Sequence, residues 1–288
     1  MGLRINQNIA AANAYRNLSV TDSQMGKSLE KLSSGFRINR AADDAAGLSI
    51  SEGLRSQIGG LKVAVRNAQD GISVVQTAEG ALTETHSILQ RMRDLAVQAS
   101  SSGSQASDAQ EAAQTEFAEL GKELDRIAST TSFGGQNLLD ASTAYVGTFQ
   151  VGANNTTNDQ ISVDLGTAIF GSATGAPTAF DSTGLGVGTS VSLLGTGGTS
   201  AITAIDNAIK GVSTARATLG AYQNRFEHTI NNLNVAVENL SASESRIRDT
   251  DMAQEMVAFT RSQILTQAGT SMLAQANQAP QSVLSLLR

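Results

Sequence analysis

The chain has no cysteine, no tryptophan, only two prolines and few aromatic residues. Without cysteine it can form no disulfide, no thiolate metal site and no cysteine nucleophile. Aromatic residues make up 4% of the 288 residues, whereas a compact enzyme of this length would bury more aromatic mass. The two prolines are Pro177 and Pro280, so helices in the first 176 residues meet no proline break. This composition favours narrow helical interfaces filled by Leu, Ile, Val and Ala.

Positive charge and long apolar runs are also scarce. The formal net charge is −6 and the pI is about 5.0, which argues against a nucleic-acid-binding face. No apolar stretch approaches the ~20 residues of a membrane span. Asn6, Gln7, Asn8 and Asn13 interrupt the apolar core of about 7–15 residues that a secretory signal peptide requires. We therefore expect no membrane segment, and either a cytosolic protein or one exported without a cleaved signal.

Two segments carry apolar residues at alternating spacings of three and four, which is the heptad pattern of a coiled coil. The predicted seam in the C-terminal half is Ile202, Ile205, Ile209, Val212, Arg216, Leu219, Gln223, Phe226, Ile230, Leu233, Val237, Leu240, Glu244 and Ile247. The predicted seam in the N-terminal half is Leu54, Ile58, Leu61, Val65, Ala68, Ile72, Val75, Glu79 and Leu82. A second register of Ile88, Met92, Leu95 and Ala99 predicts a stutter after Leu82. Because an apolar stripe is unfavourable in water, we expect the two ends to pack together as an elongated antiparallel helical coiled-coil rod.

The pattern also predicts where each element lies. Amphipathic helices are expected over about 3–36, 45–98, 109–129, 200–248 and 251–288. Asp43 or Asp44 is expected to cap the second helix. The turn sequence at 131–137 predicts a hairpin, and the alternating stretches 145–151 and 161–165 predict short strands. No Lys or Arg lies between Ile127 and Ile209. The expected fold class is mainly α, with a small β-rich central insertion.

Candidate catalytic and metal sites are weak. His86 and His228 are the two histidines, and neither belongs to the His-Glu-x-x-His pattern of a zinc protease. Asp43 and Asp44 are adjacent, so their side chains diverge on a helix and suit a cap better than an acid–base pair. The glycines between 184 and 198 lack the flanking elements and acidic partner of a dinucleotide fingerprint. We therefore predict no enzyme activity, no catalytic residue, no metal and no cofactor.

Both ends of the chain carry long motifs. They are Met1–Asn6, Leu32–Asn39, Ala41–Leu48 and Gln90–Gln98 on the N-terminal side, with Gly269–Gln278 and Val283–Arg288 on the C-terminal side. These motifs resemble those of bacterial flagellin. They occur in the same order as in that family, whereas the middle of the chain matches no pattern.

The resemblance implies a division into five segments. Residues 1–44 and 251–288 would pair as the inner coiled-coil domain, 45–140 and 201–250 would form a rod domain, and 141–200 would be a variable, β-rich outer region. Family members are secreted through the flagellar type III apparatus and polymerise beneath a cap protein into the extracellular filament that drives motility. The implied partners are further copies of the chain, the flagellar cap, an export chaperone, junction proteins and host Toll-like receptor 5. Nucleic acid and membrane are not among them.

Two groups of residues carry these expectations. Assembly is assigned to stripe residues at the two ends, namely Leu18, Leu29, Leu32, Met256, Phe259, Met272, Leu273, Leu284 and Leu287. By resemblance, the receptor would contact a face bearing Gln90, Arg91, Leu95, Glu116, Ile205, Ile209 and Arg225. The terminal stripes are narrow and interrupted by polar residues, so burial offsets little of the ordering entropy. We expect these ends to order on assembly.

Three alternatives compete with a filament subunit. A hook–filament junction protein shares the terminal helices and the export route, but the stretch 269–288 favours flagellin. An enzyme on the same scaffold is disfavoured, because the middle segment has no histidine and no basic residue. An unrelated coiled-coil adaptor is disfavoured by the motifs at both ends, which periodicity alone does not supply.

Overall fold

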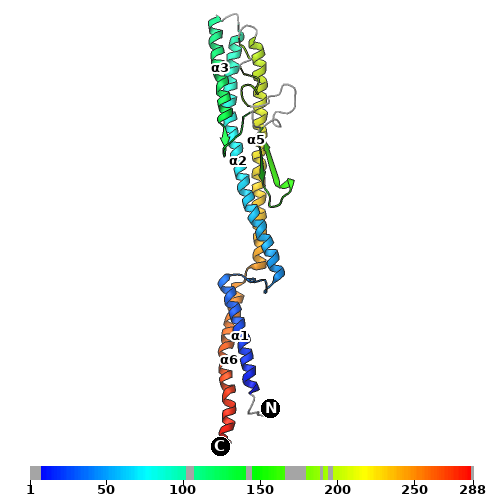
Figure 1. The fold of residues 1–288 in the computed structure, drawn as a ribbon, viewed down its shortest axis with the longest axis vertical. Coiled ribbons are helices and arrows are strands. Elements are labelled where there is room, and N and C mark those ends of the chain that lie inside the picture. The colour runs from blue at the N-terminus through cyan, green and yellow to red at the C-terminus, as the bar shows by residue number, and fades with distance from the viewer. Residues whose placement is uncertain are drawn as a thin grey trace. The chain divides into compact units, whose positions relative to one another are not determined.

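The protein is represented by a computed structural model, which describes residues 8–101, 107–140, 145–165, 180–188, 191–193 and 197–286. Most of these residues are helical, and Figure 1 shows the long helices that make up the fold. The five predicted helices are confirmed, and their bounds are α1 Ile9–Ser34, α2 Ala45–Ser100, α3 Ser107–Thr130, α5 Gly197–Arg248 and α6 Met252–Leu286. The expected mainly α fold class is therefore correct.

The predicted hairpin and strands are also present. Strands β1 (Ser132–Phe133) and β2 (Gln136–Asn137) pair antiparallel. Gly134 and Gly135 connect them with φ values of 59° and 83°, a left-handed conformation that favours glycine. A second hairpin pairs β3 (Val146–Gln150) with β4 (Gln160–Asp164), and the short 3₁₀ helix η1 (Thr157–Asp159) precedes β4.

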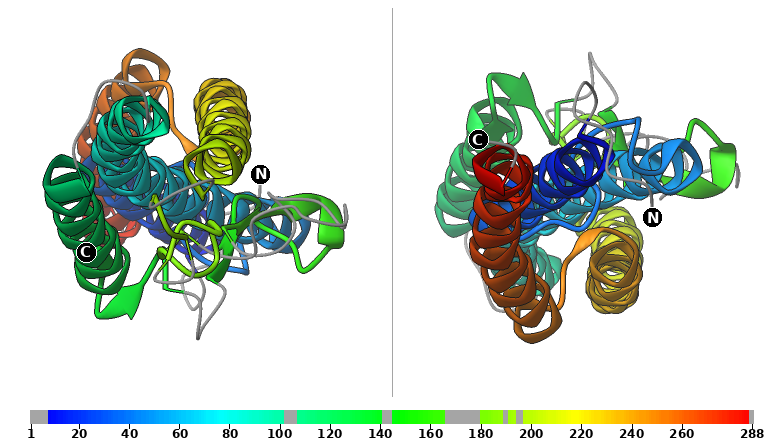
Figure 2. Two further views of the ribbon diagram at one scale, coloured as in Figure 1. Left: turned by 90° about the horizontal axis from the view of Figure 1, so that it is seen from above. Right: turned by 90° about the horizontal axis from the view of Figure 1, so that it is seen from below.

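The chain divides into two compact units. The first unit comprises residues 1–56 and 238–288, and the second comprises residues 57–237. In the second unit α2 and α5 run antiparallel side by side, as Figures 1 and 2 show. Two contacts set their register: Arg93 donates to Asp206 with a nitrogen–oxygen distance of 2.7 Å, and Gly71 lies against the ring of Phe226.

The seam of α2 differs from the predicted one at every second position. Ala68, Val75 and Leu82 are buried as predicted, but the seam positions between them are the small residues Gly71 and Ala78, with Val74 buried beside the seam. The observed seam is Ala64, Ala68, Gly71, Val75, Ala78, Leu82, Thr85, Leu89, Met92, Ala96 and Ala99. Small residues take these places because they let large side chains of neighbouring helices approach. A Cβ at Gly71 would lie 2.7 Å from Phe226 Cζ. The predicted stutter after Leu82 is wrong, since the spacing of three and four continues unbroken.

The same correction applies to α5. Ile205, Val212, Leu219, Phe226 and Leu233 are buried as predicted. Between them the seam uses Ala201, Ala208 and Ala215, whereas the predicted Ile202, Ile209 and Arg216 are only half-buried beside it. Arg216 and Glu79 had appeared as polar interruptions of the two seams. They flank the seams instead, with Arg216 Nη2 3.8 Å from Glu79 Oε1.

The described residues of the middle segment share the core of the second unit. Val151, Ile161 and Val163 are buried in one cluster with residues of α2, α3 and α5. The ring of Phe149 meets that of Phe226 edge to face, with centroids 5.6 Å apart. Asp125 on α3 accepts hydrogen bonds from the backbone N–H and the hydroxyl of Ser182, at 2.7 and 3.1 Å. These contacts attach the segment to the helices.

In the first unit α1 and α6 pack together as an antiparallel pair. Asn8 Nδ2 donates to the carbonyl of Ala276 at 2.7 Å near one end, and Lys31 lies 3.8 Å from Glu255 near the other. The predicted cap of α2 is Asp44, because its Oδ1 accepts the Gly47 N–H at 2.9 Å. The two ends of the chain therefore pair, as the sequence predicts.

Candidate functional site

The interface between α1 and α6 consists mainly of small and polar residues. On α1 the half-buried or buried positions recur at spacings of three and four and include Ala14, Leu18, Thr21, Met25 and Ser28. On α6 the matching positions are Ser262, Thr266, Gly269, Leu273 and Ala276. A Cβ at Gly269 would lie 3.2 Å from Leu18 Cδ1, so glycine allows a close approach there. This interface buries few large apolar side chains.

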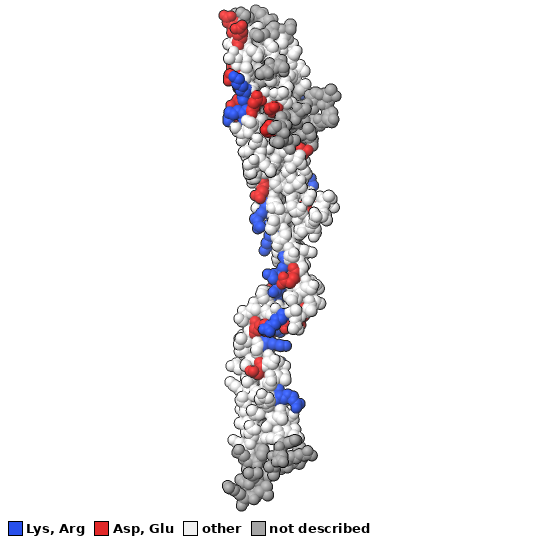
Figure 3. Space-filling view, viewed as in Figure 1, with Lys and Arg blue, Asp and Glu red and all other residues white. Residues whose placement is uncertain are grey.

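Most of the large apolar side chains of the pair face outward instead. They are Ile9, Tyr15, Val20 and Leu29 on α1, with Met252, Met256, Val257, Ile264, Leu265 and Met272 on α6. Met272 is 65% exposed. No charged residue occurs between Ser262 and Leu286. On the face drawn in Figure 3, few charged side chains interrupt the described surface of this pair. An outward apolar surface with few charges is typical of a face that another protein covers.

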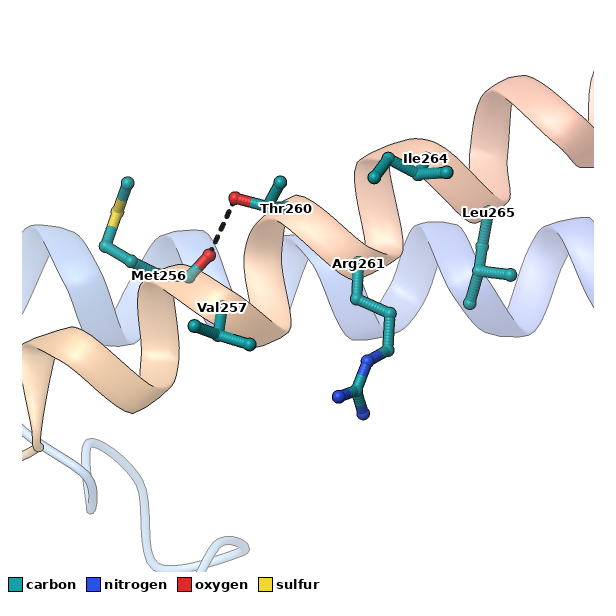
Figure 4. A pocket seen from close by; sticks show the side chains of 6 residues that line it. All are labelled: Met256, Val257, Thr260, Arg261, Ile264 and Leu265. Carbon is teal, nitrogen blue, oxygen red and sulfur yellow. Dashed lines mark hydrogen bonds between the residues drawn. The ribbon is translucent and has the colours of Figure 1, made fainter.

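A shallow groove of about 530 Å³ runs along this outward surface of α6. Met256, Val257, Thr260, Arg261, Ile264 and Leu265 line it. Figure 4 shows Val257, Arg261 and Leu265 on one side of the helix, one turn apart, so Arg261 lies between two apolar neighbours. Figure 4 also shows the hydrogen bond from the Thr260 hydroxyl to the Met256 carbonyl, which is 2.9 Å long. The groove thus combines apolar side chains with one guanidinium.

The predicted assembly residues fall into two sets. Leu29, Met256 and Met272 are exposed and belong to the outward surface. Leu18, Leu32, Phe259 and Leu273 are half-buried along the α1–α6 pair. The side chain of Leu284, like residue Leu287, lies outside the described residues. The predicted assembly residues omit Val257, Ile264 and Leu265 of the outward surface. The absence of charge after Arg261 was a signal for Ile264 and Leu265.

The residues expected to contact a receptor lie partly in the core. Gln90, Arg91 and Glu116 are exposed, and Arg91 Nη2 lies 2.7 Å from Glu116 Oε1. Leu95 is only 3% exposed and Ile205 is fully buried. Because these two side chains fill the helical interface, a partner at the surface does not reach them.

Arg225 lies apart from the other receptor candidates. Its neighbour Phe226 packs on Gly71 of α2. Gly71 lies 20 residues before Arg91 on that helix, which is a distance of about 30 Å at 1.5 Å per residue. Arg225 lines a separate groove between α5 and the β3–β4 hairpin, together with His228 and Asn158. Ile209 is half-buried near the level of Gln90. The structure therefore brings together Gln90, Arg91 and Glu116, but not Arg225.

The connectors between the helices of the first unit are tied to each other. The N–H of Arg37 donates to the Arg248 carbonyl at 2.7 Å, and the Thr250 N–H donates to the Gly35 carbonyl at 3.0 Å. The Arg248 guanidinium lies 4.7 Å from the centroid of the Phe36 ring and 2.9 Å from Glu52 Oε1. The two connectors therefore form one structured contact, which includes an ion pair and a cation–π contact of Arg248.

Asp43 organises the first connector. Its Oδ2 accepts the N–H groups of Arg40 and Asn39, at 3.0 and 3.2 Å. These hydrogen bonds stabilise the charged carboxylate and lower the pKa of Asp43 below its ordinary value of 3.8. Asp43 and Asp44 thus act as two separate backbone acceptors, as the sequence favoured.

Among the described residues, no three side chains of His, Asp or Glu come close enough together to hold a metal ion. Within the same part of the chain, no helix combines the length and the apolar character needed to cross a membrane.

Comparison with known proteins places the chain in a family. Residues 5–144 match the bacterial flagellin N-terminal helical region, and residues 202–287 match the bacterial flagellin C-terminal helical region. A flagellin from Halalkalibacterium halodurans is 54% identical over 284 residues, covering 99% of each chain. A flagellin from Bacillus subtilis is 51% identical over 306 residues, covering 99% of this chain and 100% of the relative.

The fold has a further counterpart among solved structures. A candidate flagellar hook-associated protein from Vibrio parahaemolyticus has a TM-score of 0.55 at 13% identity, over 72% of this chain and 100% of that one. At that identity the likeness concerns the fold alone. The sequence matches at both ends and along nearly the whole chain show that it belongs to the bacterial flagellin family, whose members are structural subunits of the flagellar filament.

Proposed function

We propose that this chain is a structural subunit that self-assembles into the extracellular flagellar filament through the outward apolar surface of α1 and α6. The observation that carries the proposal is the inverted distribution of side chains in this helix pair. Small and polar residues such as Ser28, Ser262 and Gly269 lie inside, while Met256, Ile264 and Met272 lie outside. A surface of this kind is stabilised when further copies cover it.

The structure also supports different roles for the two units, with the second unit stable by itself and the α1–α6 pair making contacts between subunits. The second unit buries Leu82, Leu219 and Phe226 completely and has a core of its own. The α1–α6 pair leaves most of its large apolar side chains exposed. The pair therefore gains more than the second unit does from contacts with neighbouring subunits, and we expect its order to depend on assembly.

Electron microscopy of the purified protein tests this function. The full chain is seeded or polymerised with salt beside a variant lacking residues 1–40 and 252–288. We expect long uniform tubes from the full chain and none from the shortened variant, whose second unit keeps its helical circular dichroism. Soluble monomers or short caps from the full chain under every condition would refute the filament role and favour a junction protein.

Export and capping complete the proposed pathway. Family membership supports export through the flagellar type III apparatus, with a chaperone in the cytoplasm and a cap protein at the growing tip. A hook–filament junction protein is the alternative function, and the fold shared with a hook-associated candidate keeps it open. The high identity to flagellins over nearly the full chain favours the filament subunit.

We also propose that the monomer is a ligand of host Toll-like receptor 5 through Gln90, Arg91 and Glu116. These side chains are exposed on adjacent turns of α2 and α3 and present a charged pair. Leu95 and Ile205 would support this face from the core. Replacing Arg91 with Ala is expected to lower the potency of the monomer on receptor-bearing reporter cells by about tenfold. Arg126→Ala, which removes an exposed arginine of α3 away from this pair, is the control. Unchanged potency of Arg91→Ala would remove Arg91 from the site.

A further inference from the structure

Several charged side chains of the α1–α6 pair form no ion pair within the described part of the chain, and two of them, Asp22 and Arg261, are exposed, lie among apolar side chains and have opposite sign. On these two helices the described carboxylates are Asp22, Glu30 and Glu255. Glu30 pairs with Arg40 at 2.9 Å, and Glu255 lies 3.8 Å from Lys31. Asp22 forms no ion pair or hydrogen bond within the described residues. Arg261 is likewise unpaired there, although it is the single basic residue of α6 up to Leu286.

Each of these charges lies at the centre of an apolar stripe. Asp22 lies seven residues from both Tyr15 and Leu29, so the three share one face of α1, and both neighbours are exposed. Arg261 lies four residues from both Val257 and Leu265 and shares their face of α6 (Figure 4). When a neighbouring molecule covers these stripes, both charges lose water. A buried charge without a partner costs several kcal/mol, so each requires an opposite charge on the neighbour.

The two charges lie at the same level of the helix pair but on opposite sides. Leu18 contacts Gly269 and Lys31 lies near Glu255, so the antiparallel register places Asp22 beside Ile264, one turn from Arg261. With 3.6 residues per turn, the positions that face the partner helix direct Asp22 to one side of the pair and Arg261 to the other. The two groups therefore do not meet within one chain, in agreement with the absence of a bond between them among the described residues.

We propose that Asp22 of one subunit forms an ion pair with Arg261 of a second copy, and that this contact repeats along the assembly. Because the two charges lie on opposite sides of the α1–α6 helix pair, the contact between two subunits is head-to-tail. In a row of subunits, one terminal subunit keeps an unpaired Asp22 and the other keeps an unpaired Arg261. Such a contact adds copies without closing into a dimer. The proposal rests on the proposed filament function, which it deepens by naming a specific contact between subunits.

Charge exchange in the full chain tests the pair. Asp22→Arg and Arg261→Asp each place like charges together, and each is expected to raise the critical concentration for polymerisation by roughly a hundredfold. The double variant restores opposite charges and is expected to polymerise within about threefold of the parent chain, less than 1 kcal/mol. Asp22→Arg combined with Lys27→Asp is the matched control, since it reverses a second exposed charge of α1 and should not rescue.

A cross-linking measurement distinguishes two explanations for lost polymerisation: the repulsion expected at the Asp22–Arg261 contact, and misfolding of a charge variant. The chain has no native cysteine, so Asp22→Cys with Arg261→Cys provides two unique thiols per molecule. The double cysteine variant removes both charges together and is expected to polymerise. A short thiol-reactive linker should then join polymerised subunits into a ladder of covalent multimers.

The possible results test the Asp22–Arg261 ion pair separately from the filament function. Rescue by the double exchange, or the multimer ladder, supports the pair. Tubes from both single charge variants at the parent concentration would overturn the pair and leave the filament role intact, and so would tubes without a ladder. Absence of tubes from the parent chain would overturn the filament role and the pair with it.

Discussion

At the residue scale, the packing of the second unit depends on small side chains in the helical seams. Gly71 illustrates this, because the Phe226 ring occupies the space where a Cβ would lie. Glycine within a helix costs roughly 1 kcal/mol relative to alanine, so its presence needs a compensating contact. The contact with a fully buried aromatic ring supplies that compensation.

Gly71→Ala is therefore expected to lower the stability of the second unit. A Cβ 2.7 Å from Phe226 Cζ forces the ring to move, at a cost of about 1–3 kcal/mol for an overpacked core. Gly80→Ala is the control, because nothing lies within 4 Å of its built Cβ, and it should stabilise the same helix by about 0.5–1 kcal/mol. Denaturant unfolding followed by circular dichroism measures both. Equal shifts in the same direction would contradict the packing argument.

The Asp43 carboxylate gives the first unit a dependence on pH. Hydrogen bonds from the Arg40 and Asn39 backbone lower its folded pKa below 3.8. The stabilisation is therefore complete above the unfolded pKa and is lost as pH falls through the folded pKa. Asp43→Ala should lower the thermal midpoint at pH 7, and the difference from the parent chain should vanish well below pH 3.8. Asp70→Ala, at an exposed position of α2, is the control, and a difference that persists in strong acid would exclude this role.

At the element scale, the middle segment is attached to α3 by a few polar contacts over a shared apolar core. Asp125 accepts two hydrogen bonds from Ser182, and Gln114 Oε1 accepts the Leu193 N–H at 2.6 Å. The Ser182 side chain is buried, so its donors need these acceptors. The attachment thus depends on α3 side chains that the helical pattern alone treats as surface residues.

Removing the Asp125 carboxylate should loosen this attachment. Asp125→Ala leaves two donors of Ser182 unsatisfied at a cost of about 1–3 kcal/mol, since buried polar groups need partners. Hydrogen exchange of the amides at 180–188 should accelerate, while that of α2 amides near Leu82 should not. Asp108→Ala, at the start of the same helix, is the control. Unchanged exchange at 180–188 would show that the apolar contacts alone attach the segment.

At the scale of the whole molecule, the two units differ in where they place their large apolar side chains. The second unit encloses them, whereas the α1–α6 pair exposes Tyr15, Ile264 and Met272. We therefore propose that the pair is the part of the molecule whose stability depends most on neighbouring copies. The contrast supports the proposal that one chain combines a self-sufficient folded unit with a part that orders on assembly.

Hydrogen exchange of monomer and polymer is expected to show this contrast. Amides of α1 and of α6 should exchange faster in the monomer than α2 amides around Val75, because few large side chains are enclosed between α1 and α6. In the polymer their exchange should slow by at least about tenfold, since assembly adds its free energy to theirs. Amides around Leu219 serve as the internal reference. Full protection of α1 and α6 in the monomer would contradict the dependence on assembly.

The sequence by itself determined the positions of the helices, the hairpin at 131–137 and the two short strands that follow it. Heptad spacing, a cap by Asp43 or Asp44 and the Gly134–Gly135 turn are local signals, so they can be read without a partner. Pairing of the two ends also followed, because each apolar stripe requires another one. The family motifs at both ends indicated a flagellin, in which the two ends also pair.

Only the tertiary structure decided which residues of each stripe are inside. At positions such as Ala215 and Arg216, or Ala78 and Glu79, two neighbouring registers fit the same spacing. The choice depends on the shape of the opposing helix, which admits small residues at close approach and moves Arg216 and Glu79 to the flank. Packing between distant segments sets these outcomes, and periodicity along one segment does not contain that information.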